Sequence, residues 1–356
     1  MTGEALWRRL SAEALVEGDY PKRGEVQSPW YVRAMLGVAG WIGALFLIGF
    51  VGTALVSVMN DGASAATAGA VCCGVAYGLF RRFDGQVFVE QFALALSVAG
   101  QILLVVGLGQ LLQPEDPAFY FAIAGMQAAL AWAVPNFLHR VLATSSAAVA
   151  LALAVHQLSL HGLAAPLLCA SVAWVWLDPA RWARNGRLWR PIGYGLVLAL
   201  LLVETFGLFG AEAWFERADE APGWITLHGP LIGRGLTAAV LMWVAAALSI
   251  REGFAPASRT VLSAVGAALL VGIFSLGAPG LAASLLILLL GFAASNRIVM
   301  ALGVLSLLGF VGHFYYSLHA TLLEKSGMLA LSGLVLIAAH FVLRRRASAA
   351  EEPGDA

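Results

Sequence analysis

The sequence predicts an all-α fold: a polytopic transmembrane helical bundle of about twelve helices, with both termini in the cytoplasm. Three observations predict it. Hydrophobic residues fill 60% of the 356 positions and charged residues only 12%, whereas soluble domains are nearer a quarter charged. Apolar runs of membrane-spanning length recur along most of the chain. Lys and Arg concentrate in alternate connecting segments, as they do in the cytoplasmic loops of membrane proteins.

This composition also excludes several classes of protein. A dozen helices of roughly 20 residues would occupy most of the chain and leave no room for a sizeable soluble catalytic domain. The 21 basic and 21 acidic residues balance, so net charge predicts no affinity for nucleic acid. Cys72, Cys73 and Cys169 lie in apolar stretches and form no disulfide framework; we interpret them as small packing residues.

Three segments follow from the polarity of the chain. Residues 1–33 form a cytoplasmic lead-in, 34–343 the transmembrane helical domain, and 344–356 a disordered cytoplasmic tail. Residues 4–16 have helical periodicity, which fits either a helix lying on the membrane surface or a partly ordered lead-in. The first apolar run is too long for a cleavable signal peptide, so we expect it to be the first spanning helix.

The spanning helices are predicted from apolar runs separated by turn residues such as Gly, Pro, Asn and Asp. Several runs are only 16–18 residues long, so a half-helix or a re-entrant segment among them is an alternative to full spans. The runs fall at 34–58, 64–80, 88–112, 118–134, 138–158, 162–177, 191–210, 233–250, 259–275, 278–294, 298–316 and 327–343.

Charge sets the predicted orientation. All but three of the 21 basic residues fall in the segments that this helix count places inside. The exceptions are Arg217, Arg234 and Lys325. A missed helix would scramble this alternation, so we expect a multi-pass protein of the inner membrane with both ends inside.

A short helix is predicted on the inner face, because Asp178-Pro179 forms a helix start and Asn185-Gly186 a stop. The stretch 181–190 holds four arginines and two tryptophans. It fits binding of anionic lipid at the cytoplasmic face, and it fits plain positive-inside anchoring equally well.

Three stretches carry a resemblance: PWYVR at 29–33, FVEQFALALSVAGQ at 88–101, and FYYSLHATLLEKS at 314–326. Together they resemble a bacterial "domain of unknown function" family of polytopic membrane proteins, along essentially the whole chain. The resemblance implies residence in the inner membrane and membership of a small assembly with other membrane proteins. It implies no activity, ligand or catalytic residue.

The sequence lacks the common catalytic motifs. It has no P-loop, no dinucleotide-binding glycine pattern, no His-Glu-x-x-His and no zinc-type cysteine spacing. We therefore expect neither an enzyme, nor a cofactor, nor a bound metal. The glycines of the first run, at 37, 40, 43, 49 and 52, have spacings that favour close helix packing.

The candidate intramembrane polar site comprises Glu204, Arg234, Glu90 and Gln101. Ionisable groups at membrane depth are costly unless they are paired or face a cavity. Glu204 lies about 20 Å along its helix from Pro191, so it is either functional or part of a structural ion pair. Arg234 begins the next run and is the partner that we hypothesise. Glu90 fits an interfacial residue as well, and Gln101 fits an interhelical hydrogen bond.

The candidate docking or ligand site on the outer face comprises Tyr315, Tyr316, His319 and Lys325. An aromatic belt with a local ion pair explains the same composition. Five histidines fall in the predicted outer half, but no two of them have the spacing of three or four that places two metal ligands on one helix face.

Two functions remain open from the sequence. The first is a transporter or permease for a small solute or ion, with Glu204 in its polar interior. The alternative is a non-catalytic scaffold subunit of an envelope membrane complex. A lipid-modifying enzyme ranks third, because no acid–base pair or nucleophile is found.

Overall fold

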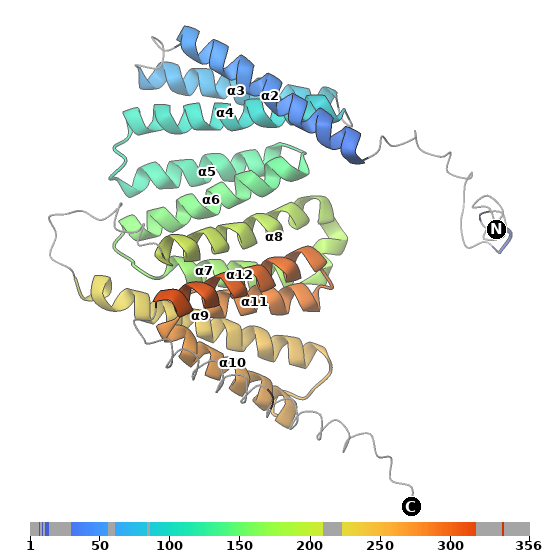
Figure 1. The fold of residues 1–356 in the computed structure, drawn as a ribbon, viewed down its shortest axis with the longest axis vertical. Coiled ribbons are helices and arrows are strands. Elements are labelled where there is room, and N and C mark those ends of the chain that lie inside the picture. The colour runs from blue at the N-terminus through green and yellow to red at the C-terminus, as the bar shows by residue number, and fades with distance from the viewer. Residues whose placement is uncertain are drawn as a thin grey trace, which may run out of the picture. The chain divides into compact units, whose positions relative to one another are not determined.

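We analysed a computed structural model that describes residues 30–55, 61–83, 86–208 and 223–317, with isolated positions 7, 9, 11–13 and 337. The fold is all-α (Figure 1). The eleven helices found in these ranges are α2 (Trp30–Leu55), α3 (Gly62–Arg82), α4 (Val87–Leu111), α5 (Pro117–Ala133), α6 (Phe137–Gln157), α7 (Ala164–Trp176), α8 (Pro179–Leu208), α9 (Trp224–Arg251), α10 (Arg259–Gly277), α11 (Leu281–Ala293) and α12 (Arg297–Ser317).

These helices coincide with the first eleven predicted runs. The twelfth run, 327–343, lies outside the described residues except for position 337, so the count of twelve stays a prediction. Among the described helices, α3, α4, α6, α8, α9, α10 and α12 are long and apolar enough to cross a membrane. The chain is therefore a multi-pass membrane protein.

Turn residues between the apolar runs cap the helices that follow them. The side chain of Asn136 accepts from the His139 N–H at 3.0 Å, and that of Asn296 accepts from the Val299 N–H at 3.2 Å. Each such cap satisfies a backbone donor that the helix itself leaves without a partner. At Asp61, hydrogen bonds from the Ser64 side chain and backbone lower the carboxyl pKa below its ordinary value of 3.8.

Arginines satisfy carbonyl groups at the opposite ends of helices. The last carbonyls of a helix lack intrahelical donors and carry partial negative charge, so a neighbouring guanidinium binds them well. Arg140 donates to the carbonyls of Ala131 and Trp132 at the end of α5 (3.1 and 3.4 Å). Arg181 donates to Trp174 in α7, and Arg251 to Leu177 just after α7 (3.4 Å). Arg234 donates to Leu276 in α10 (2.7 Å).

The predicted short helix before residue 186 is confirmed. Asp178 accepts from the Ala180 N–H at 2.9 Å and Pro179 is the first helical residue. Asn185 then leaves helical geometry, with φ −150° and ψ 63°. The kink divides α8 into a short segment, which carries Arg181 and Arg184, and a long one, which carries Glu204.

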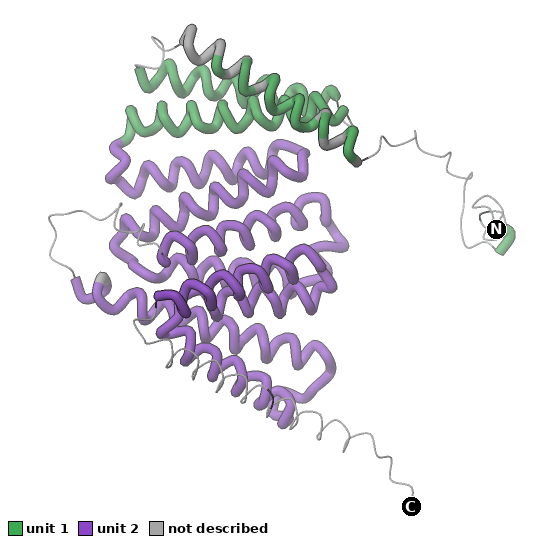
Figure 2. Tube along the Cα trace, viewed as in Figure 1, with its two compact units in different colours: residues 1–112 green, residues 113–356 purple. Residues whose placement is uncertain are grey.

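The chain divides into two compact units, residues 1–112 and 113–356 (Figure 2). In the first unit, α2 and α3 both pack on α4. A Cβ on Gly69 would lie 2.6 Å from the Gly100 carbonyl, and one on Gly40 would lie 2.9 Å from the Phe88 carbonyl. The expectation of close glycine packing is thus met at Gly40, whereas Gly49 has no atom within 4 Å of its Cβ position.

The second unit is organised around two short helices, α7 and α11, of 13 residues each. At 1.5 Å per residue each is about 20 Å long, shorter than the roughly 30 Å hydrocarbon layer. They contact each other, and both contact α8 and α9, between which they lie in Figure 1. Their side chains form the centre of the core, with Val172, Leu286 and Ile287 fully buried.

Candidate functional site

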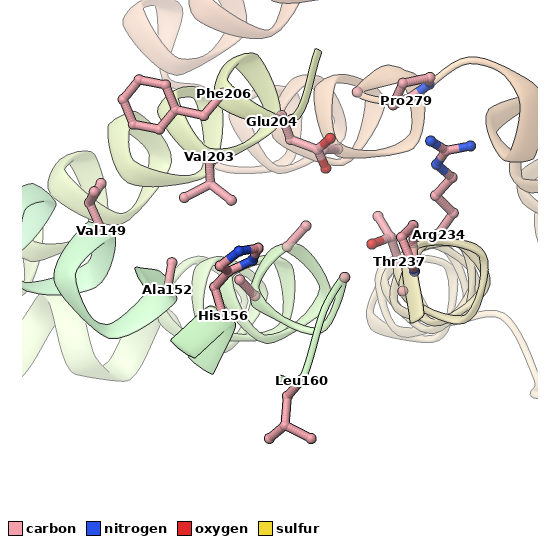
Figure 3. A pocket seen from close by; sticks show the side chains of 18 of the residues that line it. Val149, Ala152, His156, Leu160, Val203, Glu204, Phe206, Arg234, Thr237 and Pro279 are labelled. Carbon is pink, nitrogen blue, oxygen red and sulfur yellow. The ribbon is translucent and has the colours of Figure 1, made fainter. Parts of the chain in front are cut away.

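A cavity of about 140 Å³ lies in the second unit (Figure 3). Its walls come from α6, α7, α8, α9 and α10, the connection before α11, and the first turn of α11. Most of the lining is apolar. The polar side chains that line it are His156, Glu204, Arg234, Thr237 and Ser275.

Glu204 and Arg234, two of the four residues predicted to form an intramembrane polar site, both line this cavity. Glu204 comes from the last described turn of α8, and Arg234 from α9. In Figure 3 the Glu204 carboxylate is directed toward the side on which Arg234 and Pro279 lie. The tertiary structure therefore brings a carboxylate and a guanidinium, both partly buried, into one small space.

The position of Arg234 is fixed by a backbone contact. Its Nη1 donates to the carbonyl oxygen of Leu276 at 2.7 Å, next to the end of α10. A guanidinium has five N–H donors in a rigid fork, so this contact orients the group while other donors remain for the cavity. The hypothesised ion pair with Glu204 stays a prediction.

Two hydroxyl groups on the cavity wall were missed by the sequence reasoning. Thr237 is 5% exposed, and its hydroxyl, which Figure 3 shows turned toward the cavity, has no hydrogen-bond partner among the described residues. Ser275 is 3% exposed and its Oγ accepts from the Ala282 N–H at 3.3 Å. Ser and Thr in apolar helices usually bond to their own backbone, so nothing in the sequence singles these two out.

Two helix N-termini also reach the cavity. Ala164 and Ala165 open α7, and Ala283 lies in the first turn of α11. The first N–H groups of a helix lack intrahelical partners and carry partial positive charge. Gly280, the N-cap of α11, has φ +85°, and a Cβ there would strike the Phe310 ring. Glycine is therefore required for the chain to turn into α11 at this point.

The cavity is closed on one side by a contact between glycines. Gly162, with φ +82°, precedes α7, and Gly229 and Gly233 lie one turn apart on α9. A Cβ on Gly233 would collide with the Gly162 carbonyl, and one on Gly229 with the His161 carbonyl. Only glycines allow the connection before α7 to lie directly against the α9 backbone.

Two histidines that are five positions apart in the sequence meet beside the cavity. The rings of His156 and His161 are 4.5 Å apart in an edge-to-face arrangement, and His156 lines the cavity. Helical spacing does not predict this pair, because a loop rather than one helix face brings the two rings together. Within the described residues, no group of three or more His, Cys, Asp or Glu side chains is placed to hold a metal.

The other two predicted intramembrane residues lie elsewhere. Glu90 and Gln101 are on α4 of the first unit and do not line the cavity. Gln101 is 8% exposed and its Nε2 donates to Ser97 Oγ at 3.2 Å. This contact lies within one helix, and the interhelical bond of Gln101 stays a prediction.

The predicted outer-face site is described only in part. Tyr315 and Tyr316 lie in the last turn of α12, with ring centroids 5.5 Å apart, and Tyr316 is 82% exposed. His319 and Lys325 lie outside the described residues. A docking or ligand role for this group stays a prediction.

Residues 29–346 match the family model described as "Domain of unknown function (DUF4401)". No curated protein and no solved structure matches the chain.

Proposed function

The chain belongs to the DUF4401 family, and we propose that it is a permease whose cavity in the second unit binds a small polar solute on its way across the membrane. The family assignment covers most of the chain and carries no activity with it. The proposal therefore rests on the cavity and on the multi-pass architecture around it.

One observation carries the proposal: Glu204 and Arg234 line the same cavity among helices of membrane-spanning length. Charged side chains within a membrane cost free energy unless they face one another, a backbone group or a water-filled space. Retaining two opposite charges on one small cavity is costly for a protein that only needs to pack. A binding site for a polar solute would give both charged side chains a function.

The two short helices support the same function. Transporters commonly bind solutes where discontinuous helices begin or end inside the membrane. Both α7 and α11 begin at the cavity and are too short to cross the hydrocarbon layer alone. Their first N–H groups add polar donors that a continuous helix would not offer there.

We further propose an orientation in the bacterial inner membrane with both termini in the cytoplasm. The connections after α5, α7, α9 and α11 lie at one end of the second unit (right in Figure 1). Among the described residues of that unit, Arg234 is the only basic one away from this end. The positive-inside rule supports a cytoplasmic location for the arginine-bearing end, and the cavity then lies in the outer half.

Anionic lipid headgroups are the proposed partners of the arginine-bearing end. Arg184, Arg187 and Arg190 are exposed on or just after the short segment of α8. Beside them Arg181 stacks on the Trp174 ring, 3.3 Å from its centroid. Exposed cations with interfacial tryptophans are typical of a surface that contacts anionic headgroups.

Current recordings on proteoliposomes test the permease proposal. We expect at least one class of small polar solute to evoke a current or uptake in vesicles holding the full chain. Glu204→Gln should abolish it. Glu252→Gln, which neutralises an exposed carboxylate outside the cavity, should not. Absence of both binding and transport across amines, carboxylates, amino acids and inorganic ions would favour the scaffold alternative.

A further inference from the structure

Resting on the proposed function, we propose that the solute is a small zwitterion, with a carboxylate bound by Arg234, Thr237 and the start of α11, and an ammonium group bound by Glu204. The class is that of a small α-amino acid. Neither the family description nor the permease proposal specifies it.

The anion-binding side of the cavity is built from three kinds of donor. Arg234 is held by the Leu276 carbonyl at 2.7 Å and keeps other N–H donors for a carboxylate, which a guanidinium binds in a forked geometry. Thr237 lies three residues further along α9, on the same face, and its hydroxyl lacks a partner among the described residues. Because Thr237 lines the cavity, its hydroxyl can donate a hydrogen bond to a ligand oxygen there.

The start of α11 completes this side. Ser275 and the first turn of α11 are joined by the Ala282 N–H bond to Ser275 Oγ at 3.3 Å. The bond uses an acceptor site of Ser275 and leaves its O–H free to donate. The start of α11 carries partial positive charge and adds to the donors of Arg234, Thr237 and Ser275. Together these groups favour a negatively charged ligand group at this wall.

The cation-binding side is Glu204, which approaches the cavity from α8. A carboxylate accepts several hydrogen bonds, so it can bind an ammonium group whatever else it contacts. A simple anion would meet repulsion from Glu204, and a simple cation would meet repulsion from Arg234. A ligand that carries both charges is complementary to both walls.

Size narrows the class further. A cavity of about 150 Å³ in another protein admits benzene, with its six carbon atoms, and the cavity here is about 140 Å³. A molecule of about six non-hydrogen atoms fits, as in alanine. Val149, Ala152 and Val203 line the cavity and suit a small apolar side chain. An indole side chain exceeds this space.

Equilibrium binding to the purified full-length chain in detergent tests the class. The probes are L-alanine, propionate, ethylamine and L-tryptophan, which separate the zwitterion from its two halves and from a larger homologue. We expect L-alanine to bind at least about tenfold more tightly than propionate or ethylamine, since each missing charged hydrogen bond is worth about that factor. We expect L-tryptophan to bind at least as weakly as these two, because its side chain exceeds the cavity. This comparison needs no mutant.

Variants locate the binding groups. Thr237→Val keeps the shape and removes the hydroxyl, and we expect it to weaken L-alanine binding about three- to tenfold. The matched control is Thr205→Val on α8, whose hydroxyl bonds to its own helix at 2.7 Å and is absent from the cavity lining; it should leave binding unchanged. Arg234→Lys, which keeps the charge, should weaken binding because the forked geometry is lost.

The outcomes separate this inference from the permease proposal. Propionate or ethylamine binding as tightly as L-alanine would overturn the zwitterion class and leave a solute site of another class. Equal effects of Thr237→Val and Thr205→Val would overturn the placement of the carboxylate. Failure of every small polar solute to bind or move would overturn the permease proposal itself.

Discussion

Glu204 on α8 and Arg234 on α9 line one cavity, and both helices that carry them pack against α7 and α11. Consecutive spanning helices usually touch each other. Here two short buried helices contact both of them, so the charged side chains reach a shared space from different walls. This arrangement supports the proposed binding site.

The energetic relation of these two residues is testable by a double-mutant cycle on Glu204→Ala and Arg234→Ala. A tight buried pair would lose about 3–5 kcal/mol on removal of one partner, less where water reaches it, and the double variant would recover part of that loss. Because Arg234 is also held by Leu276 but shares one cavity with Glu204, we expect a coupling of about 0.5–1 kcal/mol between the two losses, the low end of the range for residues that share a cavity. Chemical unfolding in detergent measures the free energy of unfolding of each variant. Recovery of stability beyond this coupling in the double variant would establish a structural pair.

The glycine contact beside the cavity predicts a sharp difference between two substitutions on α9. Gly233→Ala should destabilise the protein by about 1–3 kcal/mol, because the added methyl meets the Gly162 backbone and overpacks a tight contact. Gly235→Ala has no atom within 4 Å of the new Cβ and should be neutral or stabilising by about 0.5–1 kcal/mol, as for glycine in a helix interior. Similar unfolding curves for the two variants would contradict the contact.

Arg140 is predicted to stabilise the end of α5. Its guanidinium binds three carbonyls, those of Ala131, Trp132 and Arg187, at 3.1, 3.4 and 3.0 Å. Arg140→Gln should therefore cost about 1–3 kcal/mol, the range for hydrogen bonds to a charged group on a partly exposed side chain. Arg184→Gln removes an exposed charge from the same end of the unit and should change stability by less than about 0.5 kcal/mol. Equal losses of stability in Arg140→Gln and Arg184→Gln would show that only the net charge matters.

The orientation is predicted from the distribution of arginine. A reporter fused after Arg346 should be active in the cytoplasm, and one inserted near Asp219 should be active outside. The reason is the positive-inside rule applied to the basic residues. An external carboxyl terminus would mean an odd number of spans, and a cytoplasmic signal from the reporter near Asp219 would reverse the side on which the cavity lies.

The positions of the helices were determined by the sequence itself, because they depend on local properties. A run of about 20 apolar residues forms a helix in lipid wherever it occurs, and the residues that interrupt it cap the next helix, as Asn136 and Asn296 do. The stop at Asn185 follows from the same local chemistry. Glu204 could be singled out because a carboxylate within an apolar run is costly whatever surrounds it.

Only the tertiary structure decided what Glu204 faces. The sequence predicts Arg234 near it because the two helices are consecutive, but Thr237, Ser275 and the start of α11 reach the cavity through packing around α7 and α11. Sequence periodicity does not specify which distant helix fills a given groove, since nearly every face of these helices is apolar. Side-chain shape decides that, as where glycines at 162 and 233 let one backbone touch another. The charges were therefore readable from the sequence, and the site that they form was set by the packing of the helices.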